Sequence, residues 1–355
     1  MNLDNLKATA KQMVAPGKGI IAADESTSTC KKRFDAVGIE CTEENRRLYR
    51  TTLFETPGLE QYISGIILYD ETIRQRGSNG TLVPEILSNK GILPGIKVDA
   101  GAKDMALHAG EKITEGLDGL RERLAQYKSL GAKFAKWRAV ITIGDPPAGG
   151  PSEACVFANA HALARYAALC QEADIVPIVE PEVLIDGDHT IEQCYETTET
   201  TLEEVFEELD HQRVMLEGTI LKASMVIAGK KAAKPSSVEE VADQTLRCLN
   251  ATLPKNLAGV VFLSGGQGDE QATAHLNKMN QMDKQPWPLS FSYSRAIQNP
   301  VLKKWAEDFK KNISAGGGSS FGGKAAQDIL LFRSKMNSLA TQGKFSDEME
   351  KDRPY

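Results

Sequence analysis

The chain contains 355 residues, of which 41% are hydrophobic and 25% are charged, and its formal net charge at pH 7 is -6. This composition excludes a chain that is disordered throughout, and no apolar run approaches the ~20 residues that a membrane-spanning helix needs. The acidic balance also argues against a general nucleic-acid-binding protein, because such proteins carry a basic excess.

The amino-terminal segment, MNLDNLKATAKQMVAP, lacks the apolar core of a signal peptide. The six cysteines are scattered along the chain without a CxxC pair, which is typical of reduced thiols. We therefore expect a cytoplasmic protein.

Eight short apolar segments recur along the chain and are predicted to be strands. They span residues 19–24, 62–70, 91–99, 134–141, 175–183, 218–226, 259–266 and 288–295. Near-continuous apolar runs of this length are typical of strands that are buried on both faces of a parallel sheet.

The segments between these strands are long enough for crossover helices, and several show helical spacing of their apolar residues. Helices are predicted at 42–54, 116–130, 152–173, 190–210, 236–250 and 324–340. Thr42, and Ser236 or Ser237 before two glutamates, supply helix-start signals.

Eight strands that alternate with helices predict an α/β fold, a single (β/α)₈ TIM barrel over residues 1–340, followed by a flexible tail over 341–355. A doubly wound open sheet is the alternative. It would need a glycine fingerprint after the first strand, where the sequence has AADEST.

Charged and hydroxyl side chains lie at the carboxyl ends of the predicted strands, where a barrel places its active site. They are Asp24, Glu25, Ser26, Asp70, Glu71, Lys97, Asp99, Lys136, Arg138, Glu180, Glu182, Lys222, Ser224, Ser264, Ser292, Ser294 and Arg295. Residues two apart in a strand point to the same side. Both members of the pairs Lys97/Asp99, Lys136/Arg138 and Glu180/Glu182 can therefore point toward the barrel axis. A network of ion pairs could explain any single pair, but the whole set favours a catalytic site.

Three strand lysines among carboxylates indicate amine chemistry. A lysine in an apolar wall is pushed toward its neutral form, which attacks a carbonyl, and the resulting iminium helps to break an adjacent C–C bond. Ser-Gly-Gly at 264–266 and Ser-x-Ser-Arg at 292–295 form a predicted phosphate cradle. A metal-based mechanism needs clustered histidines, and the five here show no HxH or HxxxH spacing. We expect neither a metal nor a cofactor.

Over essentially the whole chain, the sequence resembles the class I fructose-bisphosphate aldolases. The matching segments include GIIAADEST, TEENRRLYR, GIKVD, FAKWRAVI, IVPIVEPEVLIDGDH, LEGTILK, GVVFLSGGQ and FSYSRA. The resemblance implies a metal-independent Schiff-base lyase of glycolysis and gluconeogenesis. Its reaction is the reversible cleavage of fructose 1,6-bisphosphate to dihydroxyacetone phosphate and glyceraldehyde 3-phosphate. The resemblance also implies a homotetramer.

The same resemblance implies catalytic roles for individual residues. Lys222 corresponds to the Schiff-base lysine, and Glu180, with Glu182 beside it, to the acid/base for dehydration. Asp24 corresponds to the residue that handles the C4 hydroxyl proton, and Lys136 to the cation that steers proton transfers.

The substrate phosphates are expected to bind at two further groups of residues. Those for the ketone half are Ser264, Gly265, Ser292 and Arg295, and those reaching toward the aldehyde half are Ser26, Thr29, Arg33, Lys97 and Arg138. Tyr355 corresponds to the terminal tyrosine that protonates the enamine carbon, on a tail that reaches the active site.

The chain departs from the family pattern at several positions. Thr29 replaces a common Ser, Ser294 replaces the usual Gly, and Ala223-Ser224 replaces Pro-Asn. Ser294 is expected either to crowd the phosphate or to give it another donor. Two alternatives stay open: another Schiff-base or transaldolase-like enzyme acting on sugar phosphates, and a non-enzymatic scaffold. The preference among fructose bisphosphate, fructose monophosphate and sedoheptulose bisphosphate also stays open.

Overall fold

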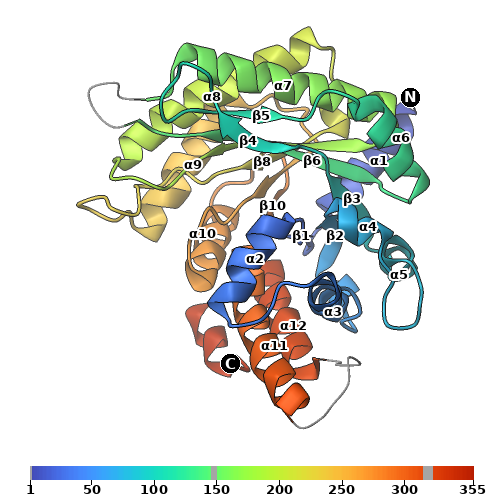
Figure 1. Ribbon diagram of the computed structural model, residues 1–355. Coiled ribbons are helices and arrows are strands. Elements are labelled where there is room, and N and C mark those ends of the chain that lie inside the picture. The colour runs from blue at the N-terminus through green and yellow to red at the C-terminus, as the bar shows by residue number, and fades with distance from the viewer. Residues whose placement is uncertain (1, 145–149, 315–322) are drawn as a thin grey trace.

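The computed structural model describes residues 2–144, 150–314 and 323–355, and within them eight parallel strands close into a barrel (Figure 1). The barrel strands are β1 (Gly19–Ala22), β2 (Ile63–Leu68), β3 (Leu93–Lys97), β6 (Phe134–Ile141), β7 (Val176–Val183), β8 (Ile220–Ala223), β9 (Gly259–Phe262) and β10 (Leu289–Tyr293). Their order around the barrel is β1-β10-β9-β8-β7-β6-β3-β2, so the first and last strands pair. Each lies inside a segment predicted to be a strand, and the predicted barrel is confirmed.

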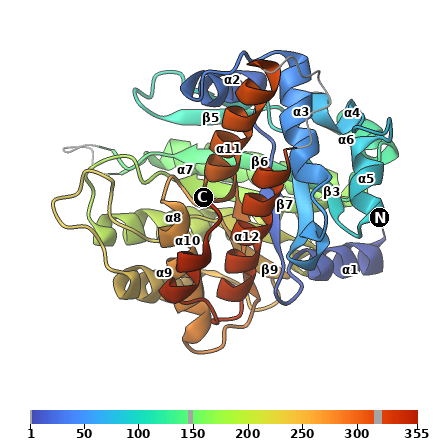
Figure 2. The ribbon, with the colours of Figure 1, turned by 90° about the horizontal axis from the view of Figure 1, so that it is seen from below.

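Helices surround the barrel and connect its strands. They are α1 (Leu3–Met13), α2 (Thr27–Ala36), α3 (Glu43–Phe54), α4 (Asp70–Arg74), α5 (Val83–Asn89), α6 (Leu120–Ser129), α7 (Glu153–Glu172), α8 (Ile191–His211), α9 (Val238–Thr252), α10 (Asp269–Gln281), α11 (Arg295–Ser314) and α12 (Lys324–Ala340). Figure 2 shows α11 and α12 side by side, where they extend the outer helical layer. Within the described residues, no helix is long and apolar enough to cross a membrane.

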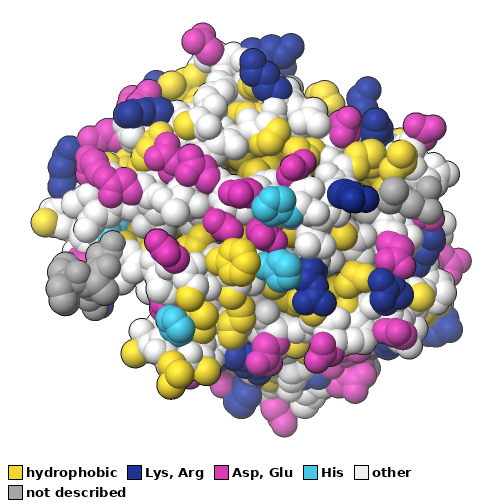
Figure 3. Space-filling model, turned by 90° about the horizontal axis from the view of Figure 1, so that it is seen from above, with side chains coloured by type: hydrophobic (Ala, Val, Ile, Leu, Met, Phe, Trp, Pro, Cys, Tyr) yellow, Lys and Arg dark blue, Asp and Glu magenta, His cyan; other side chains and the backbone are white. Residues whose placement is uncertain are grey.

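Side-chain capping fixes several of the predicted helix starts. Thr42 accepts a hydrogen bond from the Asn45 backbone N–H ahead of α3. Ser237 forms a capping box with Glu240 at the start of α9, and Thr190 begins α8 in the same way. The helix that follows Thr190 is rich in Glu, and Figure 3 shows the face over α7 and α8, where acidic side chains are spread among basic, histidine and hydrophobic ones.

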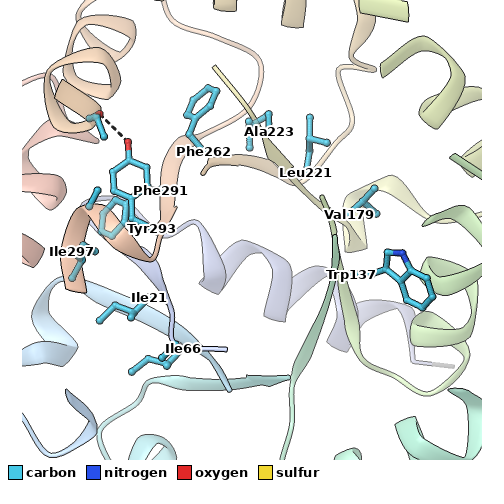
Figure 4. Packing of buried hydrophobic residues seen from close by; sticks show 14 of the residues in the cluster. Ile21, Ile66, Trp137, Val179, Leu221, Ala223, Phe262, Phe291, Tyr293 and Ile297 are labelled. Atoms are coloured by element: carbon cyan, nitrogen blue, oxygen red, sulfur yellow. Dashed lines mark hydrogen bonds between the residues drawn. The ribbon is translucent and has the colours of Figure 1, made fainter. Parts of the chain in front are cut away.

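Alternation along the strands separates two apolar clusters. Trp137, Val179 and Leu221 belong to the large cluster between the strands and the outer helices (Figure 4). The second cluster fills the interior, where Phe134 meets apolar residues of other strands and of α1. Since this cluster occupies the amino-terminal part of the barrel, the polar side chains of the same strands lie at the carboxyl ends.

A small antiparallel hairpin follows β3 and was not predicted. It consists of β4 (Gly101–Asp104) and β5 (Lys112–Glu115), and most of its residues are exposed or half-buried. Short, polar strands of this kind lack the apolar run that marks the barrel strands. The hairpin matters for function because its first residues reach the pocket described below.

The carboxyl-terminal tail packs on the outside of the barrel. Its 3₁₀ helix (Asp347–Asp352) brings Glu350 to the fully buried guanidinium of Arg333, with an N···O distance of 2.5 Å. The Tyr355 hydroxyl donates a hydrogen bond of 2.8 Å to Asp269 at the start of α10. The tail therefore follows α12 as predicted, and its movement to the active site stays a prediction.

Candidate active site

A pocket of about 860 Å³ opens at the carboxyl ends of the barrel strands. All but one of the predicted site residues line it: Asp24, Ser26, Thr29, Arg33, Lys97, Lys136, Arg138, Glu180, Glu182, Lys222, Ser264, Gly265, Ser292 and Arg295. The exception is Tyr355, which lines a second pocket of about 580 Å³ that shares Arg295 with the first. Another pocket of about 820 Å³ contains residues of α7 and α8 but none of the predicted site residues. The predicted site residues therefore identify the pocket at the strand ends as the candidate active site.

Lys222 projects from β8 into this pocket and is only 4% exposed. Its neighbours Leu221 and Ala223 belong to the outer apolar cluster, which holds the strand and turns the lysine inward. The Nζ atom lies 3.0 Å from Glu180 Oε1 on the adjacent strand β7. Ser224, one residue after β8, donates a hydrogen bond of 3.0 Å to the Val183 carbonyl and links the two strand ends. A buried amine thus lies in direct contact with a buried carboxylate.

Lys136 on β6 lies among carboxylates from three directions. Its Nζ atom is 2.8 Å from Asp24 Oδ2, 3.4 Å from Glu180 Oε2 and 3.9 Å from Asp99 Oδ2. Burial lowers the pKa of Lys136, but Asp24 and Glu180 raise it further, so the net shift is upward and the amine stays charged. Burial raises the pKa of Asp24, but Lys136 and Lys222 outweigh this effect and hold it at about 2.

Two further ion pairs continue this pattern toward the pocket mouth. Lys97 Nζ lies 2.6 Å from Asp99 Oδ1, and the Arg138 guanidinium contacts Glu182. Burial lowers the pKa of Arg138, but Glu182 raises it more and the net shift is upward. Lys97 on β3 and Arg138 on β6 come from neighbouring strands. These two strands pair directly, with Lys97 opposite Lys136.

The turn after β9 forms a concave backbone surface beside Arg295. Gly265 and Gly266 have φ angles of +59° and +97°, which strongly favour glycine. A Cβ on Gly266 would lie 2.7 Å from Lys230 Nζ and 3.2 Å from Arg295 Nη2, so two cations lie directly above the turn. Successive glycines of this kind point backbone N–H groups at anions, and the arrangement suits a phosphate.

Lys230 was not predicted as a site residue. It lies in the loop after β8, and its Nζ atom is 2.9 Å from Asp186 Oδ1. The loop has no strand or helix periodicity, so the sequence did not indicate that Lys230 lies near the pocket. Glu25, Asp99 and Ser294 also line the pocket, although they were noted only as strand-end residues.

Helix α2 forms the opposite wall. The Ser26 side chain caps it by accepting a hydrogen bond of 3.4 Å from the Thr29 N–H, and both residues line the pocket. Arg33, in the last turn, contacts Glu25 and Ser294. The pocket therefore has cations on both walls and lysine–carboxylate pairs at its base, an arrangement suited to a doubly phosphorylated substrate with a reactive carbonyl.

The described residues contain no group of three or more His, Cys, Asp or Glu side chains that could hold a metal ion. The pocket carboxylates Asp24, Asp99 and Glu180 instead contact lysines. The expectation that the protein needs no cofactor stays a prediction.

Comparisons with known proteins agree with this geometry. The family model for class-I fructose-bisphosphate aldolase matches residues 5–354. A probable class 1 fructose-bisphosphate aldolase from Xanthomonas campestris is 58% identical over 97% of this chain and 99% of its own length. A cytosolic fructose-bisphosphate aldolase from Arabidopsis thaliana is 46% identical over 97% of this chain and 92% of its own.

A solved structure is also similar. It is a fructose-bisphosphate aldolase from Plasmodium falciparum in complex with TRAP and a small-molecule inhibitor. It is 46% identical, the match covers 97% of this chain and 95% of that one, and the TM-score is 0.90.

Proposed function

Because the chain belongs to the class I fructose-bisphosphate aldolase family, we propose that Lys222 carries the family's lyase reaction, the reversible cleavage of fructose 1,6-bisphosphate to dihydroxyacetone phosphate and glyceraldehyde 3-phosphate. The observation that carries this assignment is the 3.0 Å contact between Lys222 Nζ and Glu180 inside the pocket. A buried lysine with a carboxylate at this distance has both parts that imine formation needs, a nucleophile and a proton carrier.

The first steps form the iminium. Lys222 Nζ attacks the C2 carbonyl of the ketose, and the carbinolamine then loses its hydroxyl as water. Glu180 lies close enough to take two protons in turn from the Lys222 ammonium and deliver both to the C2 oxygen, which then leaves as water. The positive nitrogen that results withdraws electrons from C3.

Cleavage of the C3–C4 bond sends its electron pair toward the iminium and leaves an enamine. The C4 hydroxyl loses its proton to Asp24, and the aldehyde product departs. Lys136 and Lys222 lower the pKa of Asp24 against the effect of burial, so a shift of Lys136 toward Glu180 or Asp99 would make Asp24 a stronger base as it takes the proton. Lys136 can make this shift because both alternative partners already lie within 4 Å of its Nζ atom.

The enamine then takes a proton at C3, and water releases dihydroxyacetone phosphate from Lys222. We assign that protonation to Tyr355. The tail must first leave its contact with Asp269, since Tyr355 lies outside the pocket in this structure.

Borohydride trapping tests the assignment. Reduction in the presence of dihydroxyacetone phosphate should inactivate the enzyme irreversibly, and peptide mapping should place the adduct on Lys222. Lys222→Met should abolish both trapping and cleavage, while Lys230→Met, which removes a lysine at the edge of the site, should still be trapped. An adduct mainly on Lys136 or Lys97 would contradict the assignment. EDTA should leave the rate unchanged.

The same assays separate the alternatives. A transaldolase-like enzyme would need a second sugar as acceptor, and a scaffold would show neither cleavage nor trapping. We also propose a homotetramer and a cytoplasmic location, as the family resemblance implies. The relative from Arabidopsis thaliana that is named cytosolic supports the location. Light scattering coupled to size exclusion would measure the oligomeric state.

A further inference from the structure

The hydroxyl of Ser294 joins the two walls of the pocket. Ser294 lies between β10 and α11, and its Oγ atom accepts hydrogen bonds of 3.2 Å from both Nη1 and Nη2 of Arg33 on α2. It donates a bond of 2.8 Å to Glu25 Oε1, and Gln298 Nε2 lies 3.2 Å away. We propose that Ser294 is a positioning residue that orients the Arg33 guanidinium toward substrate phosphate. The proposal rests on the aldolase function of this pocket.

The bonding capacity of the hydroxyl shows how Ser294 acts. A serine hydroxyl has one proton and two acceptor sites. Its proton goes to Glu25, and the two N–H groups of Arg33 occupy its acceptor sites. Ser294 therefore has no donor left for a phosphate, and any effect on substrate binding must pass through its partners.

Those partners are themselves firmly held. Gln298 is 1% exposed and donates to the Ala22 carbonyl at 2.6 Å, while its amide oxygen accepts from Tyr49 at 3.1 Å. Gln298 also donates to Glu25 Oε1 at 2.8 Å. Glu25 and Gln298 are thus a fixed platform, and Arg33 is the cation of the cluster, with a partly exposed side chain that lines the pocket.

Arg33 retains the capacity to bind an anion in this position. A guanidinium carries five N–H donors, and the contacts with Glu25 and Ser294 use only part of them. Arg295, the residue after Ser294, lines the same pocket, and the charge of Arg33 contributes to the lowered pKa of Arg295 behind the larger effect of burial. The Ser294 contact therefore keeps Arg33 beside a second phosphate-binding guanidinium. Without it, Glu25 alone would hold a long and flexible side chain.

The test compares Ser294→Ala with Ser294→Thr, which keeps a hydroxyl. The readouts are KM and kcat for fructose 1,6-bisphosphate, and the inhibition constant of a hexitol 1,6-bisphosphate, which has no carbonyl for Lys222 to attack. Ser294→Ala should raise KM and the inhibition constant about three- to tenfold, the range that the net loss of one ordinary hydrogen bond gives, with kcat changed less than about twofold. Ser294→Thr should stay closer to the unmodified enzyme.

Ser290→Ala is the matched control. Ser290 lies on the same strand, and its hydroxyl bonds to the Lys18 carbonyl outside the pocket. This variant should leave both constants unchanged.

A double-mutant cycle shows whether Ser294 acts through Arg33. Arg33→Ala should raise the inhibition constant at least as much as Ser294→Ala, and adding Ser294→Ala to it should change nothing further. An equal effect of Ser294→Ala with and without Arg33, or an unchanged inhibition constant in Ser294→Ala, would overturn the proposal. If the unmodified protein binds the hexitol bisphosphate with this pattern but cleaves no substrate, the proposed function fails while the positioning role stands.

Discussion

Lys136 illustrates how single residues set the chemistry of the pocket. A buried charge is tolerated only when opposite charges surround it, and removal of one partner leaves the others uncompensated. Lys136 has three such partners, and its contact with Asp24 keeps that carboxyl ionised. The alternation of lysine and carboxylate around the barrel therefore allows these charges to be buried, and it supplies the proton carriers that the proposed reaction needs.

Arg295 and Lys230 lie over the same glycine turn but are expected to contribute unequally. The planar guanidinium of Arg295 can hold a phosphate through two charge-assisted bonds, worth ~1.5–3 kcal/mol each. Arg295→Ala should raise KM for fructose 1,6-bisphosphate by about tenfold or more, at ~1.4 kcal/mol per decade. Lys230→Ala should raise it less, because the lysine amine cannot bind a phosphate bidentately and is already paired with Asp186.

Lys231→Ala is the control for Lys230, since it removes the same charge from the next exposed residue. KM measured at constant ionic strength should be unchanged in this variant. Equal increases at the two positions would mean that surface charge, rather than contact with the turn, determines the effect.

Elements differ in how visibly the sequence encodes them. The barrel strands were predictable because burial on both faces makes them continuously apolar, and α12 begins and ends at the predicted residues. The hairpin of β4 and β5 was not predictable, because its strands are short, polar and largely exposed. Side-chain contacts between residues far apart in the sequence could not be predicted either. Arg33 and Ser294 lie 261 positions apart, and nothing in either segment predicts their hydrogen bond.

Helix α10 contains a buried histidine that should make stability depend on pH. His275 is 1% exposed, its Nδ1 is 2.6 Å from Gln267 Oε1, and burial lowers its pKa from 6.5 to about 4, against a smaller opposing effect of Glu239. Between these values the unfolded chain binds a proton that the folded chain does not. Stability should therefore fall as the pH drops from 6.5 to 4, by up to ~3 kcal/mol from this residue.

Urea unfolding at several pH values would measure this effect. His275→Gln should show a smaller loss of stability between pH 6.5 and 4 than the unmodified chain, even if it is less stable at pH 7. The same pH slope in both proteins would contradict the assignment.

The tail is the element whose predicted role requires a movement. Burial raises the pKa of Tyr355 above its usual value, so the phenol that bonds to Asp269 keeps its proton at neutral pH. Deletion of Tyr355, or Tyr355→Phe, should leave borohydride trapping at Lys222 intact. Both changes should slow turnover and slow still more the exchange of the C3 proton of dihydroxyacetone phosphate with solvent. Exchange at the original rate in both variants would mean that the tail only packs against α10.

At the scale of the whole molecule, the barrel interior combines an apolar floor with a charged upper half. The ring of Phe134 occupies space that glycines on two neighbouring strands leave open. A Cβ on Gly95 would lie 2.2 Å from this ring, and one on Gly65 would lie 2.9 Å from it. Close packing of this kind fixes the strands whose later residues, Lys97 and Lys136, face the pocket.

Gly95→Ala should therefore destabilise the fold by ~1–3 kcal/mol or more through overpacking. Phe134→Leu removes part of the ring, so the double variant should lose less stability than the sum of the two single changes. Thermal and urea unfolding of the three variants would measure this coupling. Strict additivity would show that the contact between the ring and Gly95 is not the cause.

The pairing of β1 with β10 means that the barrel and its pocket can close only late in translation. Asp24 leaves the ribosome early and Arg295 late, and the pocket needs both. A chain that stops before β10 already carries Lys222 and Glu180, but its β1 and β9 have unpaired edges that invite association with other chains. We therefore expect interrupted synthesis to yield inactive fragments that associate with other chains, rather than a weakened enzyme.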